Sequence, residues 1–209
     1  MANLYFYHDP MCSWCWGYRP VSDQIFSNLP ESVQLVKVLG GLAADSDQPM
    51  PENLREGIPK AWLKIRDLLG TEFNFEFWTK CKPRRSTYPA CRAVIAAGIQ
   101  DQYDEMVDAI QRAYYLRAMN PSDVDTLELL ADEIGLDTER FATDIRSPDV
   151  NVTLRGQIDF ARESPIDGFP SLVIDIDDRM IPVTRDYRSA NASLEHIGRL
   201  LCENQEPRR

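Results

Sequence analysis

The residues whose types and spacing are best suited to chemistry lie in the segment Cys12-Ser13-Trp14-Cys15. Two thiols at this spacing can form a disulfide, exchange it with another disulfide, or ligate a metal ion. A structural zinc site needs two further ligands, and the candidates form no second close pair; they are His8, Cys81, Cys91, His196 and Cys202. The pattern therefore favours redox chemistry over a zinc site or an inert buried pair, and we expect no metal.

The cysteine pair lies where a strand passes into a helix. Asn3–Tyr7 is predicted to be a buried, aromatic-rich strand, a helix is predicted from about Cys12 to Leu29, and Val33–Val38 alternates like a second strand. A crossover of this length joins parallel strands in a βαβ unit. Cys12 would then lie at the helix N-terminus, where unpaired N–H groups and the helix dipole stabilise a thiolate, with Cys15 about one turn further in.

The middle of the chain is predicted to be helical. Apolar residues recur at helical spacing over 49–70, 86–100, 103–119, 122–134, 138–145 and 147–163. Strand character returns at Ser171–Ile176 and Met180–Val183, where Pro182 predicts an edge strand, and a last helix is predicted over 189–202. We therefore expect an α/β chain of order β-α-β … β-β-α. An all-helical domain (45–164) would interrupt a discontinuous domain made of 1–44 and 165–209.

Two prolines strengthen the redox interpretation. Pro20 falls inside the helix that begins at the cysteine pair, where it should kink that helix, and Phe169-Pro170 comes immediately before the third strand. With these features the chain resembles the thioredoxin superfamily, in which a kinked active-site helix and a cis-proline before the third strand are typical. The helical insertion resembles that of the DsbA family. Residues 9–17, Asp-Pro-Met-Cys-Ser-Trp-Cys-Trp-Gly, are similar to its FrnE-like, predicted protein-disulfide isomerase branch.

The resemblance implies a role for each matched residue. Cys12 would be the exposed nucleophile that attacks a substrate disulfide to give a mixed disulfide, which Cys15 would then resolve. Pro170 would be cis, and backbone groups of Phe169 would bind an extended substrate in the manner of strand addition; an ordinary turn before the strand is the alternative. No organic cofactor is implied, because the Cys12–Cys15 pair carries the electrons itself. Glutathione is a candidate co-substrate.

Residues around the pair are candidates for tuning its chemistry. The DsbA type carries Pro-His between its cysteines, whereas this chain carries Ser13 and Trp14, so we expect a weaker oxidant with an intermediate or reducing potential. His8 and Asp9 could tune the first thiol or relay a proton; strand-end solvation and helix capping by Asp9 are the alternatives. Trp14 is expected to be exposed and to contact substrate, whereas Trp16 is expected to lie in the core.

The remaining cysteines and the basic cluster have simpler explanations. Cys81 and Cys91 could form a second disulfide, but two buried free thiols are the favoured interpretation, and Cys202 is expected to be incidental. The one basic cluster could bind an anionic substrate such as glutathione, although a solvated loop is favoured; it consists of Lys80, Lys82, Arg84 and Arg85.

The composition argues against several other classes of protein. The chain has 209 residues with 33 acidic and 23 basic side chains, a net charge of −10, which argues against a nucleic-acid or anionic-membrane binder. No apolar run approaches the length of a membrane-spanning helix. Five cysteines are too few for a disulfide-stapled scaffold. The N-terminus has no secretory signal pattern, so a cytoplasmic location is expected if Met1 is the natural start.

The sequence thus predicts a thiol–disulfide oxidoreductase, similar to a protein-disulfide isomerase, acting on a disulfide-containing protein or a small thiol. One alternative is a glutathione-linked transferase or isomerase, because kappa-type transferases resemble this architecture; the second cysteine counts against it. The other alternative is a non-catalytic peptide-binding or chaperone module. The physiological substrate, the electron donor and the oligomeric state are not predicted.

Overall fold

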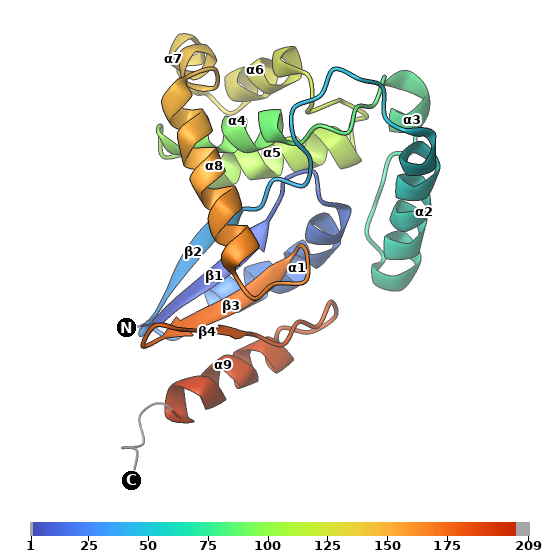
Figure 1. The fold of residues 1–209 in the computed structure, drawn as a ribbon. Helices are drawn as coiled ribbons and strands as arrows, with labels where there is room; N and C mark the ends of the chain where they lie inside the picture. The colour runs from blue at the N-terminus through green and yellow to red at the C-terminus, as the bar shows by residue number, and fades with distance from the viewer. Residues whose placement is uncertain (1, 204–209) are drawn as a thin grey trace.

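Four strands form one mixed sheet in the computed structural model, which describes residues 2–203 (Figure 1). β1 (Ala2–His8) pairs in parallel with β2 (Val33–Leu39) and antiparallel with β3 (Ser171–Ile176), and β3 pairs antiparallel with β4 (Arg179–Pro182). The spatial order is β2-β1-β3-β4. The expected parallel pair and the edge position of the last strand are confirmed, and the fold is the predicted thioredoxin-like α/β architecture.

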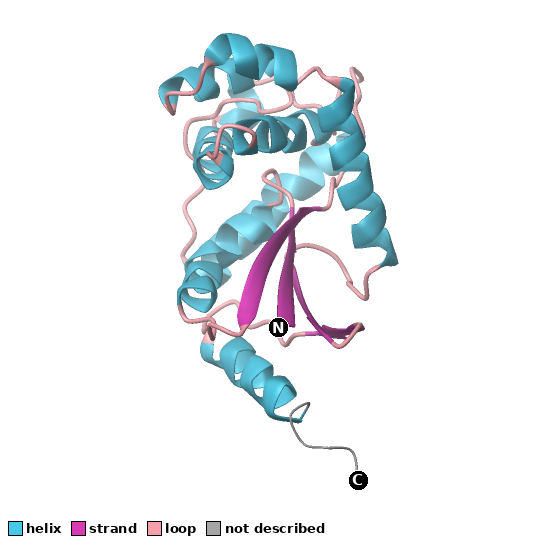
Figure 2. Cartoon of the chain, turned by 90° about the vertical axis from the view of Figure 1, so that its left-hand side faces the viewer, coloured by secondary structure: helices cyan, strands magenta, loops and turns pink. Residues whose placement is uncertain are grey.

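Helices pack on both faces of this sheet. Successive side chains of a strand point to opposite faces. Leu4 and Phe6 of β1 therefore share a core with α1 (Ser13–Ser27) and α9 (Asn191–Glu203), whereas Tyr7 packs with α8 (Pro148–Glu163) on the other face. Figure 2 shows that most of the remaining helices gather beyond one end of the strands.

Every helix of the central segment lies between β2 and β3 in the chain. Within residues 2–203 these are α2 (Glu52–Leu69), α3 (Phe77–Lys80), α4 (Tyr88–Gly98), α5 (Tyr103–Tyr115), α6 (Val124–Glu133), α7 (Thr138–Asp144) and α8. Six were expected from the spacing of apolar residues, and their ends differ from the expectation by a few residues. α3 was not expected, because a single turn is too short to display a helical period.

An aromatic cluster forms the centre of the helical segment. Trp62 of α2 is fully buried, and its ring contacts six other rings, those of Phe73, Phe75, Phe77, Trp78, Tyr114 and Tyr115. The same core includes Met11 and Leu39, which lie just before α1 and at the end of β2. The helical segment therefore packs directly against the residues that precede α1 and that end β2. Because α8 packs on the sheet as well, the division at residues 44 and 164 stays a prediction.

Helix α1 approaches α2 closely at a glycine. A Cβ atom placed on Gly17 would lie 2.7 Å from Cγ2 of Ile65, so glycine is required for the two helices to pack at this distance. Pro20 lies inside α1 and is exposed. This packing fixes the first turn of α1, which carries the cysteine pair, against the helical segment.

Candidate active site

Cys12 is the N-cap residue of α1. Its backbone is extended (φ −82°, ψ 112°), and its Sγ accepts the Cys15 N–H at 3.3 Å, as a capping oxygen would. The thiol also donates to the carbonyl oxygen of Phe169 at 3.4 Å. The expectation that Cys12 is exposed is wrong: only 6% of the residue is exposed, because its thiol lies against the Phe169 carbonyl. The sulfur atom therefore lies between the positive end of a helix and a carbonyl from a segment 157 residues away in the chain.

Cys15 lies one turn deeper and is only 4% exposed. Burial raises the pKa of the Cys15 thiol well above its usual value, and the neighbouring Cys12 thiol raises it further, while the Asp9 backbone N–H opposes the shift. Cys15 therefore remains a neutral thiol at physiological pH. All five cysteines are free in this structure. The two thiols differ in position, since Cys12 caps α1 and Cys15 lies inside its first turn.

The segment before β3 faces the cysteine pair from the opposite side. The Phe169–Pro170 peptide bond is cis, and the Phe169 carbonyl is the group that Cys12 contacts. The Phe169 ring lies against Gly40, which follows β2. A Cβ atom on Gly40 would lie 1.8 Å from Cζ of that ring, so this position accepts only glycine while the ring stays in place.

Gly40→Ala is expected to lower the free energy of unfolding by about 1–3 kcal/mol, the usual cost of overpacking, because the Phe169 ring must leave its place. In a Phe169→Ala background the same substitution should cost much less, since the clashing ring is gone. Gly57→Ala, in α2 with no atom within 4 Å of the added Cβ, is the matched control and should be neutral or stabilising. Chemical denaturation of the four variants measures the coupling energy between Gly40→Ala and Phe169→Ala. An equal loss of unfolding free energy with and without the Phe169 ring would contradict the predicted clash.

Asp9 is buried and does not cap α1, whose N-cap residue is Cys12. Its carboxylate instead accepts hydrogen bonds from three separate segments of the chain. Its Oδ1 accepts the Met11 N–H at 2.8 Å, and its Oδ2 accepts the Leu42 N–H at 2.8 Å and the Thr87 hydroxyl at 2.7 Å. The Cys91 thiol donates to the same oxygen at 3.6 Å. Burial raises the pKa of the Asp9 carboxyl, and these hydrogen bonds oppose the rise. Asp9 therefore joins the end of β1 to the start of α4.

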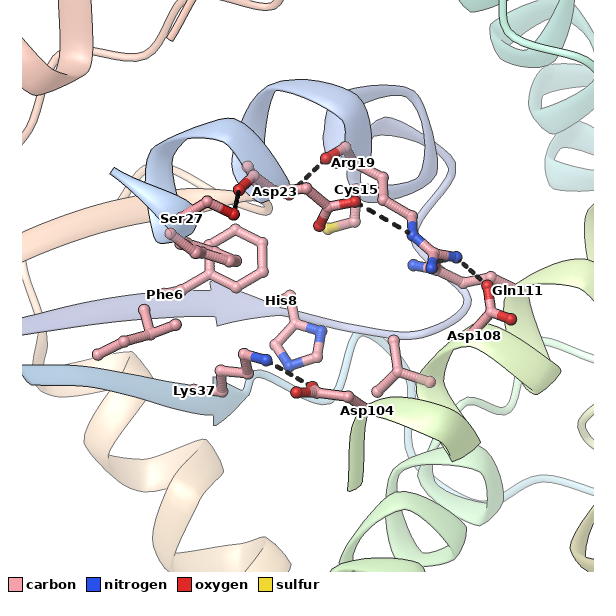
Figure 3. A pocket seen from close by; sticks show the side chains of 14 residues that line it. Phe6, His8, Cys15, Arg19, Asp23, Ser27, Lys37, Asp104, Asp108 and Gln111 are labelled. Carbon is pink, nitrogen blue, oxygen red and sulfur yellow. Dashed lines mark hydrogen bonds and ion pairs between the residues drawn. The ribbon is translucent and has the colours of Figure 1, made fainter. Parts of the chain in front are cut away.

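His8 is buried at the end of β1 and lines a cavity that also reaches Cys15. Its Nε2 is 2.9 Å from the Tyr103 hydroxyl, and its ring stacks on Phe6 with 5.1 Å between centroids. The cavity, of about 350 Å³, lies between α1, the sheet and α5 (Figure 3). Burial lowers the pKa of His8 to about 3, with Lys37 adding to the effect. His8 is therefore a neutral imidazole in a cavity that Cys15 also lines.

The two tryptophans next to Cys15 are both half-buried. Trp14 was expected to be exposed, but the Tyr187 ring packs edge-on against it at 5.2 Å and the Lys64 ammonium lies 5.9 Å from its ring centre. Trp16 stacks on Tyr115 at 5.6 Å and joins the rim of the helical core. The partial cover of Trp14 comes from a residue more than 170 positions away, for which the sequence carries no local signal.

The remaining cysteines contact different groups. The Cys81 thiol donates to the Ala118 carbonyl at 3.0 Å, whereas Cys91 is fully buried against Asp9. Cys202 is exposed near the end of α9. The structure therefore holds Cys81 and Cys91 as separate free thiols.

The basic cluster is partly neutralised by neighbouring acids. Lys80 pairs with Glu76 at 2.8 Å, and Arg84 pairs with Asp123 at 2.6 Å. Half of the cluster is thus engaged in ion pairs within the protein.

Within residues 2–203, no group of three or more histidine, cysteine or acidic side chains is arranged to hold a metal ion. Among the described helices, none has the length and apolarity needed to cross a bilayer.

Comparisons with known proteins match nearly the whole chain. A family model described as thioredoxin matches residues 5–181. A solved structure of a candidate protein disulfide isomerase from Nitrosomonas europaea is 26% identical, with a TM-score of 0.84, and the match covers 97% of this chain and 98% of that one. The cytosolic disulfide reductase DsbM from Pseudomonas aeruginosa shares the fold, with 22% identity, a TM-score of 0.78, and coverage of 96% and 99%.

A curated relative carries a different description. The ClpXP adapter protein SpxH of Bacillus subtilis is 24% identical over 173 residues, which covers 81% of this chain and 57% of that protein. The SpxH of Halalkalibacterium halodurans is 23% identical over 194 residues, covering 88% and 63%. The chain thus spans about three fifths of the length of these curated relatives.

Proposed function

This chain belongs to the thioredoxin family, and from that premise we propose that it is a thiol–disulfide oxidoreductase acting through Cys12 and Cys15. The observation that carries the proposal is the asymmetry of the pair. Cys12 Sγ caps α1 and faces the Phe169 carbonyl, whereas Cys15 is buried one turn deeper and stays protonated. One thiol is placed to attack a substrate and the other to complete the exchange.

The proposed exchange proceeds in two steps. The Cys12 thiolate attacks one sulfur of a substrate disulfide, the substrate S–S bond breaks, a mixed disulfide forms, and one substrate thiolate leaves. Cys15 then loses its proton and attacks the Cys12 sulfur, which releases the second substrate thiolate and leaves a Cys12–Cys15 disulfide. Two electrons pass from the pair to the substrate, and the oxidised pair runs the same steps in reverse.

The surrounding residues take distinct parts in this proposal. Phe169, Pro170 and Trp14 would bind the substrate on either side of Cys12, since the Phe169 carbonyl can accept a second hydrogen bond beside that from the thiol. His8 and Asp9 would tune the pKa of the Cys15 thiol or relay its proton, rather than act on Cys12. The geometry favours this assignment, because His8 shares a cavity with Cys15 and the Asp9 backbone N–H lies beside its sulfur.

The proposed substrates are disulfide-containing proteins or small thiols, with no organic cofactor, and the proposed location is the cytoplasm. DsbM, which has a similar fold, is described as a cytosolic disulfide reductase, and this supports the proposed disulfide substrates and the proposed location. A structure of DsbM with GSH also shares this fold, at 22% identity and a TM-score of 0.74, which supports glutathione as a co-substrate. The second candidate function is a protein-binding adapter, which the similarity to SpxH favours.

Cys15→Ser is the variant that tests the proposed reaction. Without a resolving thiol, the mixed disulfide formed at Cys12 should accumulate, and mass spectrometry of the purified variant should show one adduct on Cys12 that dithiothreitol removes. The Cys12→Ser/Cys15→Ser double variant should lack this adduct. The mass of the adduct distinguishes a protein partner from glutathione. Adducts confined to the exposed Cys202, or none at all, would contradict the proposal.

A further inference from the structure

The loop between β4 and α9, residues 183–190, contacts both sides of the candidate active site. In Figure 1 the chain runs out from β4 and turns back before it enters α9. Two of its side chains, Arg185 and Tyr187, reach the segment before β3 and the first turn of α1. We name residues 183–190 the β4–α9 loop.

Arg185 binds groups that precede and follow Phe169 in the chain. Its Nη1 donates to the Pro170 carbonyl and, at 3.0 Å, to the Ser171 hydroxyl, while its Nη2 lies 3.3 Å from Oδ1 of Asp167. The side chain is 26% exposed. A guanidinium is planar and presents several donors in a fixed fork, so these bonds constrain the position and the direction of the segment together.

Tyr187 continues this chain of contacts to α1. The Arg185 guanidinium carbon lies 5.9 Å from the centre of the Tyr187 ring, and that ring packs edge-on against Trp14 at 5.2 Å and against Tyr18 at 5.2 Å. Trp14 lies between the two cysteines in the sequence. The β4–α9 loop thus links the backbone next to Cys12 on one side to the helix that carries Cys12 on the other.

We propose that Arg185 is a positioning residue that sets the place of the Phe169 backbone relative to Cys12 and thereby determines the preference for extended peptide disulfides over small ones. This inference rests on the proposed function. An extended substrate must align its backbone with Phe169 while its sulfur meets Cys12, whereas a small disulfide needs only the sulfur. A displacement of about 1 Å can cost up to about 100-fold in rate when two groups must be aligned at once.

The exposed ion pair with Asp167 provides a matched control. The Asp167 side chain is 81% exposed, and an ion pair of this kind contributes little to stability. Asp167→Asn therefore leaves the bonds from Arg185 to Pro170 and Ser171 in place. Arg185→Lys keeps the charge on a single donor nitrogen but loses the planar fork, and Arg185→Met removes all of these hydrogen bonds while retaining a long apolar side chain.

The test uses two substrates with the same leaving group. One is N-acetylcysteine and the other a ten-residue extended peptide with a single cysteine, each in a mixed disulfide with 2-nitro-5-thiobenzoate, whose release is followed by absorbance. Single-turnover rates of the reduced full-length protein are measured against substrate concentration, to separate the half-saturating concentration from the maximal rate. For Arg185→Met we expect the half-saturating concentration for the peptide to rise about tenfold, with the rate for the small substrate unchanged.

Each outcome decides the inference. A partial recovery of peptide affinity in Arg185→Lys and wild-type behaviour in Asp167→Asn support it. An equal loss with both substrates would show that Arg185 only stabilises the fold, and no loss with either would show that it is dispensable; both overturn the inference. If Arg185→Met does not fold, Arg185→Lys provides the same comparison. A wild-type protein that releases no thiobenzoate from either substrate would instead overturn the proposed function.

Discussion

Cys12→Ser is expected to reduce the rate of thiol–disulfide exchange by about three orders of magnitude or more, as is usual when a covalent nucleophile is removed. A serine hydroxyl does not attack a disulfide at neutral pH. Cys15 cannot take over, because burial raises the pKa of its thiol well above the usual value. The rate of reduction of a mixed disulfide with 2-nitro-5-thiobenzoate measures the loss.

The fold of Cys12→Ser should be retained, so the loss is attributable to chemistry. Cys12 is the N-cap of α1 and its sulfur accepts the Cys15 N–H; a serine Oγ accepts such a bond at least as well. Chemical denaturation should therefore give an unchanged or slightly raised free energy of unfolding. Cys202→Ser is the control for a nonspecific thiol, since Cys202 is exposed on α9 far from the pair in the chain, and it should keep wild-type activity.

The same variant separates the two candidate functions. An adapter or peptide-binding module needs its surface, which Cys12→Ser preserves, and not its thiol. If this variant protects a client protein or recruits a partner as well as the wild type does, the adapter function explains the chain better. Loss of exchange together with loss of client processing would favour the oxidoreductase.

The parts of the fold that follow from local pattern could be predicted from the sequence. The βαβ unit, the edge strand with Pro182 and the cysteine pair at a helix N-terminus each depend on residues that are close together in the chain. Periodicity found every helix that is long enough to show a period. It missed α3 (Phe77–Lys80), because four residues cannot display one.

The contacts that position the site could not be predicted in the same way. Gly40 and Phe169, or Trp14 and Tyr187, meet only because the sheet and the β4–α9 loop bring distant segments together. A glycine in a loop or an arginine near the C-terminus is too common to point to such a partner. Helix capping, the alternative role considered for Asp9, is wrong for a related reason: its carboxyl accepts hydrogen bonds from Leu42 and Thr87, which lie far away in the sequence.

The second large effect concerns pH, and it is expected to arise at His8. Burial lowers the pKa of the folded-state imidazole to about 3, against 6.5 for an ordinary histidine. Well above pH 6.5 His8 is neutral in both states and has no effect on the pH dependence. Between about 6.5 and 3 the unfolded chain binds a proton that the folded protein does not, so the free energy of unfolding must fall as the pH falls.

The size of this contribution follows from the same shift. One proton costs about 1.4 kcal/mol per pH unit across the window, which amounts to about 5 kcal/mol over its full width. That is comparable with the whole stability of many small domains. Asp9, whose pKa is raised by burial, acts in the opposite direction, because the folded state takes up its proton at a higher pH than the unfolded chain does.

A comparison of wild type with variants separates the contribution of His8 to the pH dependence of stability from the contributions of Asp9 and other nearby groups. Lys37 of β2 and Asp104 of α5 are the charged groups that act on His8; they form an ion pair beside it (Figure 3) and stay unchanged in every variant. The difference in unfolding free energy between wild type and His8→Gln should therefore fall by about 2 kcal/mol between pH 6.5 and 4.5.

Tyr103→Phe is the matched control for this comparison. It removes the hydrogen bond between Tyr103 and His8 Nε2 but keeps the buried imidazole, so its cost should be nearly independent of pH over the same range. Urea titrations at pH 6.5, 5.5 and 4.5 measure both differences, and NMR should show a His8 ring that does not titrate between pH 5 and 8. A His8 ring that gains a proton near pH 6 would contradict the prediction, because it would show that burial does not disfavour the charged imidazole at this position.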